Sequence, residues 1–144
     1  MRNLLLFLAT LLALGQVQAA KPHALFVVGT HHYSPHETMP ALASQLDALG
    51  WKTSVLNPGY NPEKNIKGIA GLELLQKADV AIFYTRFLTL PPDQFRLIQL
   101  YLEAGKPVVG FRTSTHAFDY PKDNSLTKWN NGFGSDALGS QYFA

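Results

Sequence analysis

Hydrophobic positions along this chain fall into two patterns, short continuous runs and stripes with a helical period. Residues 24–29, 79–84 and 108–111 are runs dominated by Ala, Val, Ile and Phe. Such continuous apolarity is typical of strands buried on both faces of a parallel sheet. Residues 51–56 form a further, more polar run that ends at the turn sequence of residues 57–59, Asn-Pro-Gly. The pattern predicts four strands.

Between these runs the period lengthens to that of a helix. In residues 37–49 the apolar side chains recur every three or four positions, which places them on one face of a helix. A second helix is expected to begin at Pro91 and Pro92 and to stop before Gly105, and a weaker one to lie within residues 66–75. Strands and helices that alternate in this way predict βαβ units and a doubly wound parallel sheet.

The pattern fades after Asp119. The remaining sequence is rich in turn residues and carries four aromatic side chains without a strand or helix period: Trp129, Phe133, Tyr142 and Phe143. We expect loops and one short helix there. Aromatic side chains bury large areas when they pack, so four of them in irregular sequence suggest a surface that is meant to be covered. The domain is therefore expected to be incomplete at its C-terminus.

The first 19 residues have the order of a secretory signal peptide. Arg2 precedes an apolar run over residues 4–14, and Val17-Gln-Ala19 places small residues at the positions that a signal peptidase reads. The run is shorter than the roughly 20 residues that span a bilayer. We expect residues 1–19 to be removed, which leaves one α/β domain over residues 20–144 in the secreted or periplasmic space, without a stable membrane anchor.

Composition removes several function classes. The whole chain has 12 Lys and Arg against 10 Asp and Glu, and one of the 12 is Arg2 in the leader, so the expected mature chain is nearly neutral. Its basic residues are scattered, which argues against nucleic acid as a partner. Cysteine is absent, so disulfides, thiolate metal sites and cysteine nucleophiles are excluded together.

Most of the candidate chemistry follows the ends of the predicted strands. In an open parallel sheet, ligands bind beyond the carboxyl ends of the strands. Four of the five histidines and two arginines fall in the segments that this edge brings together, and His23 alone precedes the first strand. The residues at the predicted edge are His31, His32 and His36 after the first strand, Arg86 after the third, and Arg112 and His116 after the fourth.

Familiar catalytic and binding motifs are missing from these segments. The first loop has neither a G-x-G-x-x-G sequence nor a flavodoxin-type phosphate loop, and Ser114 lacks the flanking glycines of a nucleophile elbow. No pair of carboxylates occurs there, so ordinary two-carboxylate glycoside hydrolysis is not supported. A small-molecule site built on histidine and arginine remains.

Residues 101–118 carry a resemblance to a known family. A helix ending in Glu-Ala-Gly is followed by a Val-Val-Gly strand and then by Arg112 and His116. This segment resembles the core signature of the ThuA-like (trehalose-utilisation) family. The first strand, with Gly29 and the histidines after it, resembles the opening motif of the same family.

The resemblance implies a flavodoxin-like fold of the class I glutamine amidotransferase-like type that has lost the amidotransferase nucleophile. It also implies a role in carbohydrate metabolism. Similar domains continue beyond the point equivalent to residues 138–142, which agrees with the expectation of an incomplete C-terminus.

Each candidate residue is assigned an expected role. We expect His116 or His32 to move a proton, because histidine titrates near neutral pH. Arg112 follows a buried strand directly, where a charge needs a partner or a ligand, and its fixed fork of donors suits an anionic or hydroxyl-rich substrate. The other residues expected to bind the substrate are Arg86, Thr113, Ser114, His31 and Tyr33.

Three hypotheses for function follow. The first is an exported enzyme that acts on a sugar or sugar derivative. The second is a non-catalytic carbohydrate-binding or interaction domain that kept the pocket. The third is a metal site formed by His31, His32, His36 and His116, but their spacing matches no recognised metal motif. We therefore expect a carbohydrate-like ligand, no metal and no cofactor, whereas the sequence leaves the oligomeric state open.

The leader gives the first testable prediction. Protein recovered from the exported fraction should begin at Ala20, because cleavage is expected after the Val17-Gln-Ala19 site. Intact-mass measurement decides the point, and a chain that still begins at Met1 in that fraction contradicts it.

Overall fold

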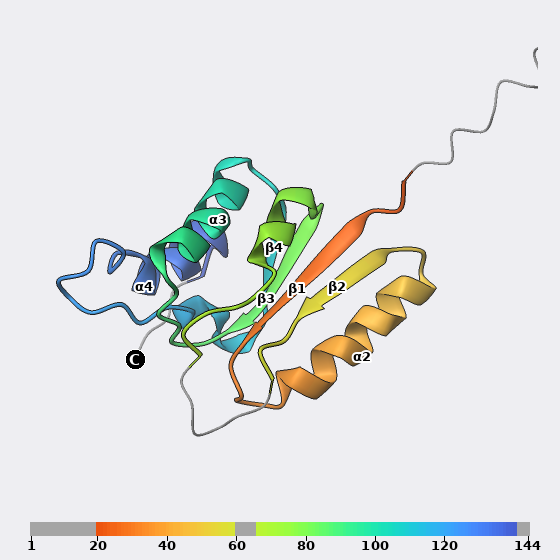
Figure 1. Ribbon diagram of the computed structural model, residues 1–144, viewed down its shortest axis with the longest axis horizontal. Helices are drawn as coiled ribbons and strands as arrows, with labels where there is room; N and C mark the ends of the chain where they lie inside the picture. The colour runs from red at the N-terminus through yellow and green to blue at the C-terminus, as the bar shows by residue number, and fades with distance from the viewer. Residues whose placement is uncertain (1–19, 60–65, 141–144) are drawn as a thin grey trace, which may run out of the picture.

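The computed structural model describes residues 20–59 and 66–140 and contains one four-stranded, all-parallel sheet (Figure 1). The strand order is β2-β1-β3-β4, so β1 and β3 are central. This confirms the predicted α/β class and is consistent with a flavodoxin-like doubly wound sheet. The expected signal peptide lies outside the described residues. The strands are β1 (His23–Gly29), β2 (Lys52–Leu56), β3 (Val80–Thr85) and β4 (Val108–Gly110).

Helices and helical turns connect the strands and follow the last one. Pro35 and Pro92 stand in the first turns of the two long helices, where proline costs no intrahelical hydrogen bond. No helix of the described residues is long and apolar enough to cross a membrane. The α-helices are α2 (Pro35–Ala48), α3 (Pro92–Glu103) and α4 (Trp129–Gly132), the 3-10 helices are η1 (Leu72–Lys77) and η2 (Arg112–His116), and a π-helical turn, η3, spans Phe133–Ala137.

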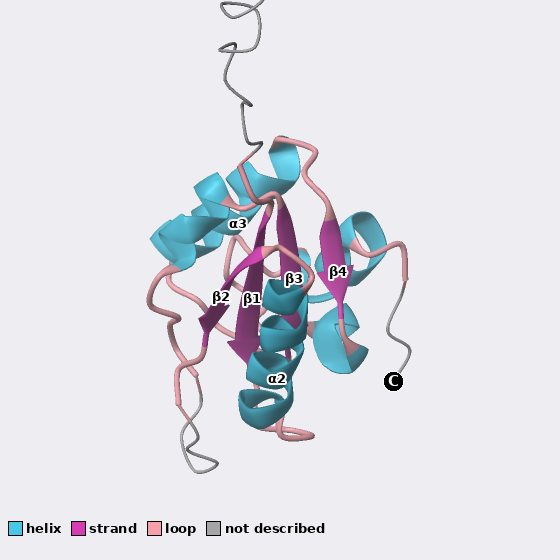
Figure 2. Cartoon of the chain, turned by 90° about the vertical axis from the view of Figure 1, so that its right-hand side faces the viewer, coloured by secondary structure: helices cyan, strands magenta, loops and turns pink. Residues whose placement is uncertain are grey.

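The central strands bury both of their faces. Every residue of β1 is buried, because α2 covers one face of the sheet and α3 covers the other (Figure 2). Alternate residues of β1 belong to the two sides of the core, with Phe26 on the α2 side and Leu25 and Val27 on the α3 side. The continuous apolar runs in the sequence therefore reflect burial on both faces, as predicted.

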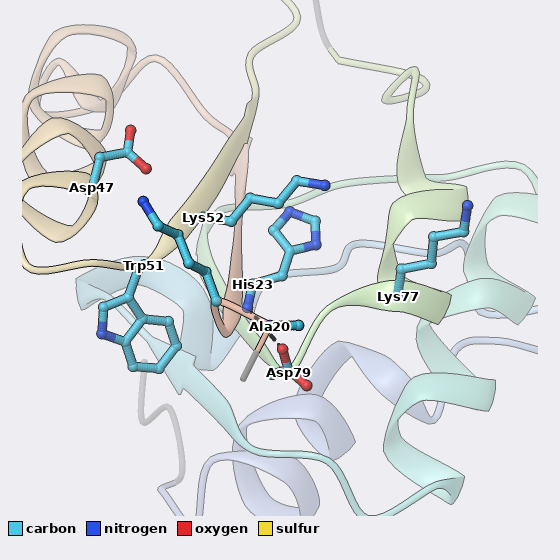
Figure 3. A pocket seen from close by; sticks show the side chains of 8 residues that line it. Ala20, His23, Asp47, Trp51, Lys52, Lys77 and Asp79 are labelled. Atoms are coloured by element: carbon cyan, nitrogen blue, oxygen red, sulfur yellow. Dashed lines mark hydrogen bonds between the residues drawn. The ribbon is translucent and has the colours of Figure 1, made fainter. Parts of the chain in front are cut away.

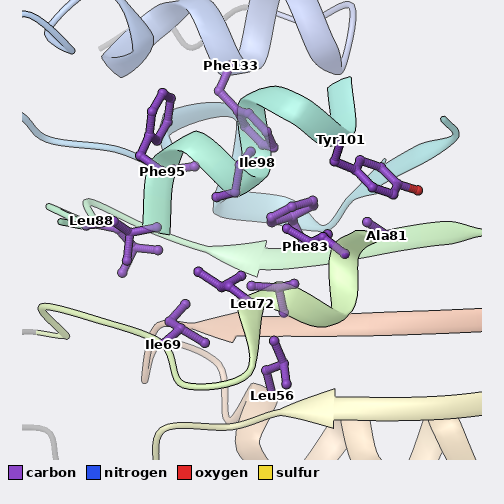
Figure 4. Packing of buried hydrophobic residues seen from close by; sticks show 14 of the residues in the cluster. Leu56, Ile69, Leu72, Ala81, Phe83, Leu88, Phe95, Ile98, Tyr101 and Phe133 are labelled. Carbon is purple, nitrogen blue, oxygen red and sulfur yellow. The ribbon is translucent and has the colours of Figure 1, made fainter. Parts of the chain in front are cut away.

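The larger part of the core lies between the sheet and α3 (Figure 4). Phe95, Ile98 and Tyr101 form the buried stripe of α3. They belong to the same cluster as Phe83 from β3 and Leu72 from η1. The three-to-four spacing of the stripe is what the sequence showed for this helix.

The weak helix expected within residues 66–75 is instead a short 3-10 helix placed later, η1. Gly71 precedes it with φ of 89°, a left-handed conformation that glycine adopts without strain. A Cβ at Gly71 would also lie 2.8 Å from Cδ2 of Leu56. The glycine therefore ends the preceding loop, and a 3-10 helix of only six residues follows.

The C-terminal segment corrects the expectation of uncovered aromatic residues. Phe133 is fully buried, and its ring makes edge contacts with Phe83 and Phe118 at centroid distances of 5.2 and 5.4 Å. Trp129 packs edge-on against Phe95 at 5.3 Å. Both side chains cover the α3 side of the core. They belong to short helical turns, which leave no repeating hydrophobic pattern in the sequence. Tyr142 and Phe143 lie outside the described residues.

Gly134 brings this C-terminal segment close to η2. A Cβ at Gly134 would lie 2.5 Å from the carbonyl oxygen of Thr115 and 2.7 Å from that of Ser140. Two backbone segments thus approach more closely than any side chain would permit. The segment that holds Phe133 in the core is therefore also packed against η2, at the carboxyl edge of the sheet.

Removal of the Phe133 ring should destabilise the domain. Phe133→Ala deletes a fully buried ring, and we expect the free energy of unfolding to fall by about 3–5 kcal/mol. Urea unfolding measures it. Leu49→Ala is the control, because Leu49 is 76% exposed and its loss should change stability by about 0.5 kcal/mol or less. Equal effects of the two substitutions would contradict the packing described here.

Candidate functional site

The carboxyl edge of the sheet brings together the segments that follow β1, β3 and β4. Gly29 and Thr85, the last residues of β1 and β3, are direct partners in the strand register. The Arg86 amide donates to the Gly29 carbonyl oxygen at 3.3 Å, and the Phe87 amide donates to the His116 carbonyl oxygen at 3.0 Å. The three segments are thus tied to one another by their backbones, as the sequence analysis predicted for this edge.

Arg86 lies between a histidine and an aromatic ring. Its Nη1 donates a hydrogen bond to Nε2 of His32 at 2.5 Å, so this nitrogen of His32 carries no proton in this arrangement. The guanidinium carbon of Arg86 lies 4.4 Å from the ring centroid of Phe87. A cation at this distance from a ring face is attracted by the ring quadrupole.

Arg112 makes a similar stack with the first loop. Its guanidinium carbon lies 3.9 Å from the ring centroid of Tyr33. Tyr84, at the end of β3, stacks on Phe111 with ring centroids 6.1 Å apart. Burial raises the pKa of Tyr84, whereas the positive charge of Arg112 lowers it in part. Arg112 therefore lies where the segment after β1 meets the segment after β4.

His116 lies beside Phe87 at the end of η2. The two ring centroids are 5.1 Å apart, and Nδ1 of His116 is 3.3 Å from Oγ1 of Thr115. Burial lowers the pKa of His116 below its ordinary value of 6.5, and the nearby charge of Arg86 lowers it further. The imidazole is consequently neutral at neutral pH and able to accept a proton.

The backbone of this edge is strained. Among the described residues, the non-glycine residues with positive φ are Tyr33 (67°), Ser34 (52°), Phe87 (49°) and Arg112 (43°). All four follow the carboxyl ends of β1, β3 or β4. Non-glycine residues in this conformation cost free energy and gather at functional sites. The strain marks the same edge as the side-chain cluster.

Thr113 and Ser114, predicted to bind substrate, are buried beneath the cluster. Oγ of Ser114 accepts a hydrogen bond from the Thr85 amide at 3.1 Å and donates to the Phe83 carbonyl oxygen at 2.9 Å. Oγ1 of Thr113 donates to the Thr85 carbonyl oxygen at 2.9 Å. In this arrangement both hydroxyls hold η2 to the end of β3.

The other two histidines predicted for this edge are His31, in the loop after β1, and His36, in α2. His31 is half-buried in the same loop. Nε2 of His36 lies 3.7 Å from a carboxylate oxygen of Glu37, in the first turn of α2. Within residues 20–59 and 66–140, no three or more His, Asp or Glu side chains are grouped closely enough to hold a metal ion.

Three aromatic residues of the site were not predicted from the sequence. Phe111 directly follows β4, Phe87 is the second residue after β3, and Tyr84 is the penultimate residue of β3. An apolar residue next to a buried strand looks like a residue of the hydrophobic core, so its type gives no sign of a functional site. Their position at the carboxyl ends of the strands is the signal that identifies them.

A separate hollow of about 640 Å³ lies at the opposite, amino edge of the sheet (Figure 3). His23 belongs to it, as expected for the histidine that precedes the first strand. The His23 amide donates to Oδ2 of Asp79 at 2.7 Å, and its Nε2 lies 2.9 Å from Oγ of Ser54. The hollow has mixed charges and none of the predicted site residues, and it is lined by Ala20, Lys21, His23, Asp47, Trp51, Lys52, Lys77 and Asp79.

We place the candidate site at the carboxyl edge, because strain, the lowered pKa of His116 and both arginine stacks occur there. Comparison with known proteins adds no relative: no protein-family model, curated protein or solved structure matches this chain.

Loss of the Ser114 hydroxyl should weaken the domain. In β3 the alternate residues Ala81 and Phe83 bond to the β4 side of the sheet, and Ser114 continues this row by satisfying the Thr85 amide. Ser114→Ala leaves that buried amide unpaired, which costs about 1–3 kcal/mol. We expect this loss in urea unfolding.

The control for this substitution is Ser44→Ala. Ser44 is exposed on α2, and its Oγ donates to the Pro40 carbonyl oxygen at 3.1 Å. Its loss should change the free energy of unfolding by about 0.5 kcal/mol or less. A Ser114→Ala variant as stable as the wild type would show that the hydroxyl is not required to hold η2.

Proposed function

We propose that this protein binds a sugar or sugar derivative at the carboxyl edge of its sheet, and that His116 accepts a proton from the bound molecule. The observation that carries the proposal is the meeting of His32, Arg86, Arg112 and His116, from three separate segments, at one strained edge. Packing of the core does not require two arginines and two histidines at this edge.

The chemistry of these side chains suits a hydroxyl-rich ligand. Tyr33 and Phe87 are 60% and 44% exposed, so their rings offer apolar surface on which the C–H face of a sugar ring packs. The guanidinium groups of Arg86 and Arg112 supply hydrogen-bond donors in a fixed geometry for ligand oxygens. A few placed polar groups beside aromatic side chains are the usual composition of a small-molecule site.

His116 is the favoured proton acceptor. Its lowered pKa keeps the imidazole neutral at pH 7, which a general base requires. Removal of a proton from a ligand hydroxyl leaves negative charge on the oxygen, and the guanidinium of Arg86 is near enough to His116 to lower its pKa. Arg86 would stabilise that charge as it develops. His32 is held by Arg86 and would fix the position of this guanidinium.

The choice of a sugar comes from the resemblance of residues 101–118 to the ThuA-like family, and we propose membership of that family on the same residues. We also propose that the domain acts outside the cytoplasm, after removal of residues 1–19. Both proposals depend on sequence features that are independent of the carboxyl-edge geometry.

The pH dependence tests the role of His116. Ligand-observed NMR with a panel of sugars and sugar acids detects both the binding of each compound and its chemical conversion by the protein. We expect conversion to be lost as the pH falls below 6.5 through the lowered pKa of His116, because protonated imidazole cannot accept a proton. At pH 6.5 the rate should already exceed half of its plateau value.

His116→Asn should abolish conversion and retain binding. His36→Asn is the matched control, because His36 is paired with Glu37 in α2 and should leave conversion unchanged. Binding without conversion by the wild-type protein would favour the non-catalytic carbohydrate-binding domain. Failure of the whole panel to bind would overturn the proposed function.

A further inference from the structure

The three arginines in the described part of the chain differ in whether a carboxylate lies beside them. Arg96, on α3, is paired with Glu103, with Nη1 of the arginine 2.9 Å from Oε1 of the glutamate. Within residues 20–59 and 66–140, neither Arg86 nor Arg112 has a carboxylate oxygen within 4.0 Å of its nitrogens. Instead each of the two stacks on an aromatic ring. The carboxyl edge thus holds two guanidinium charges that no described acid neutralises.

The stacks leave the hydrogen-bonding edges of these arginines available. A guanidinium group has five N–H donors in its plane, and a ring contacts only its face. Arg86 uses Nη1 for its hydrogen bond to His32. The rings of Phe87 and Tyr33 lie 4.4 and 3.9 Å from the two guanidinium carbons, and these contacts restrict the positions of both groups before a ligand arrives.

The charged groups that are described near Arg86 and Arg112 do not restore the balance. Glu37 is the acidic residue in the first turn of α2; its side chain is 76% exposed and lies beside His36. His116 has a lowered pKa and is neutral at pH 7. His32 accepts a hydrogen bond from Arg86 at Nε2. Within the described part of the chain, the site therefore has an excess of positive charge.

We infer that the ligand is an acidic sugar, whose carboxylate binds to Arg86 and Arg112 at the carboxyl edge. This inference rests on the proposed function and names the substrate class of the same site. A planar carboxylate matches the fork of a guanidinium, and such charge-assisted pairs are stronger than neutral hydrogen bonds. The sugar ring would then lie against the parts of Tyr33 and Phe87 that remain exposed beside the arginines.

A carboxylate fits this edge better than a phosphate. Phosphate sites commonly use the free amides of a glycine-rich loop at a helix N-terminus. Here α2 begins with Pro35, which has no amide hydrogen, and Glu37 adds a negative charge in the same turn. A group with two negative charges would meet more repulsion there than a single carboxylate.

Four matched probes test the inference: glucuronate, glucose, glucuronamide and glucose 6-phosphate. Glucuronamide keeps the shape of glucuronate and removes its charge. We expect calorimetry at pH 7 to show glucuronate binding at least about 10-fold more tightly than glucose or glucuronamide, since a charged hydrogen-bonded pair is lost with either. Glucose 6-phosphate should bind more weakly than glucuronate, and added salt should weaken the binding of glucuronate.

Arginine variants test which guanidinium groups bind the carboxylate. Arg86→Gln and Arg112→Gln should each weaken glucuronate binding by about 10- to 100-fold and reduce its preference over glucuronamide. Arg96→Gln is the matched control and should change neither value. Arg112→Lys keeps the charge without the planar fork and should give an intermediate affinity. Thermal melting of each variant confirms that it is folded.

The outcomes separate this inference from the proposed function. Equal binding of glucose, glucuronamide and glucuronate would overturn the acidic-sugar inference and leave sugar binding standing. Tighter binding of glucose 6-phosphate would also overturn it. No binding by any of the four probes would overturn the inference together with sugar binding at this edge. A preference for glucuronate that Arg86→Gln and Arg112→Gln both leave unchanged would place the carboxylate elsewhere and overturn it.

Discussion

The pairing of β1 with β3 is the constraint on which the rest of the structure depends. These two strands lie at the centre of the sheet and end at the same level, with Gly29 opposite Thr85. The chain must leave the sheet at that level on both strands, which brings His32 to Arg86. Gly29 itself permits the approach, because a Cβ there would lie 2.7 Å from Cδ1 of Leu88. A shift of register between the two strands would separate the histidine from the arginine.

The third part of the site depends on a more distant segment. β4 is short, and after Gly110 its place beside β3 is taken by η2, which the Ser114 and Thr113 hydroxyls hold to Thr85. Gly134 lets the C-terminal turns approach Thr115 from the other side, while Phe133 anchors those turns in the core. His116 is therefore positioned both by hydrogen bonds from β3 and by packing that begins more than fifteen residues later in the chain.

The sequence predicts those parts of the structure that leave a hydrophobic period along the chain. The strands and long helices were predictable, because burial of β1 on both faces and the Phe95, Ile98 and Tyr101 stripe leave clear periods. The carboxyl edge followed from topology alone. The burial of Phe133 was not predictable, since short helical turns carry no period. Likewise, the residue types of Thr113 and Ser114 do not distinguish a hydroxyl that contacts a ligand from one that hydrogen-bonds to the backbone.

The two edges of the sheet differ in how their charges are balanced, and this difference bears most directly on function. At the amino edge, lysines lie together with Asp47 and Asp79 around one hollow, so that both signs of charge are present without a ligand. At the carboxyl edge, Arg86 and Arg112 are held on aromatic rings at strained backbone positions. Strain and unneutralised charge both cost free energy in the folded state. A ligand that supplied the missing negative charge would offset the electrostatic part of that cost on binding.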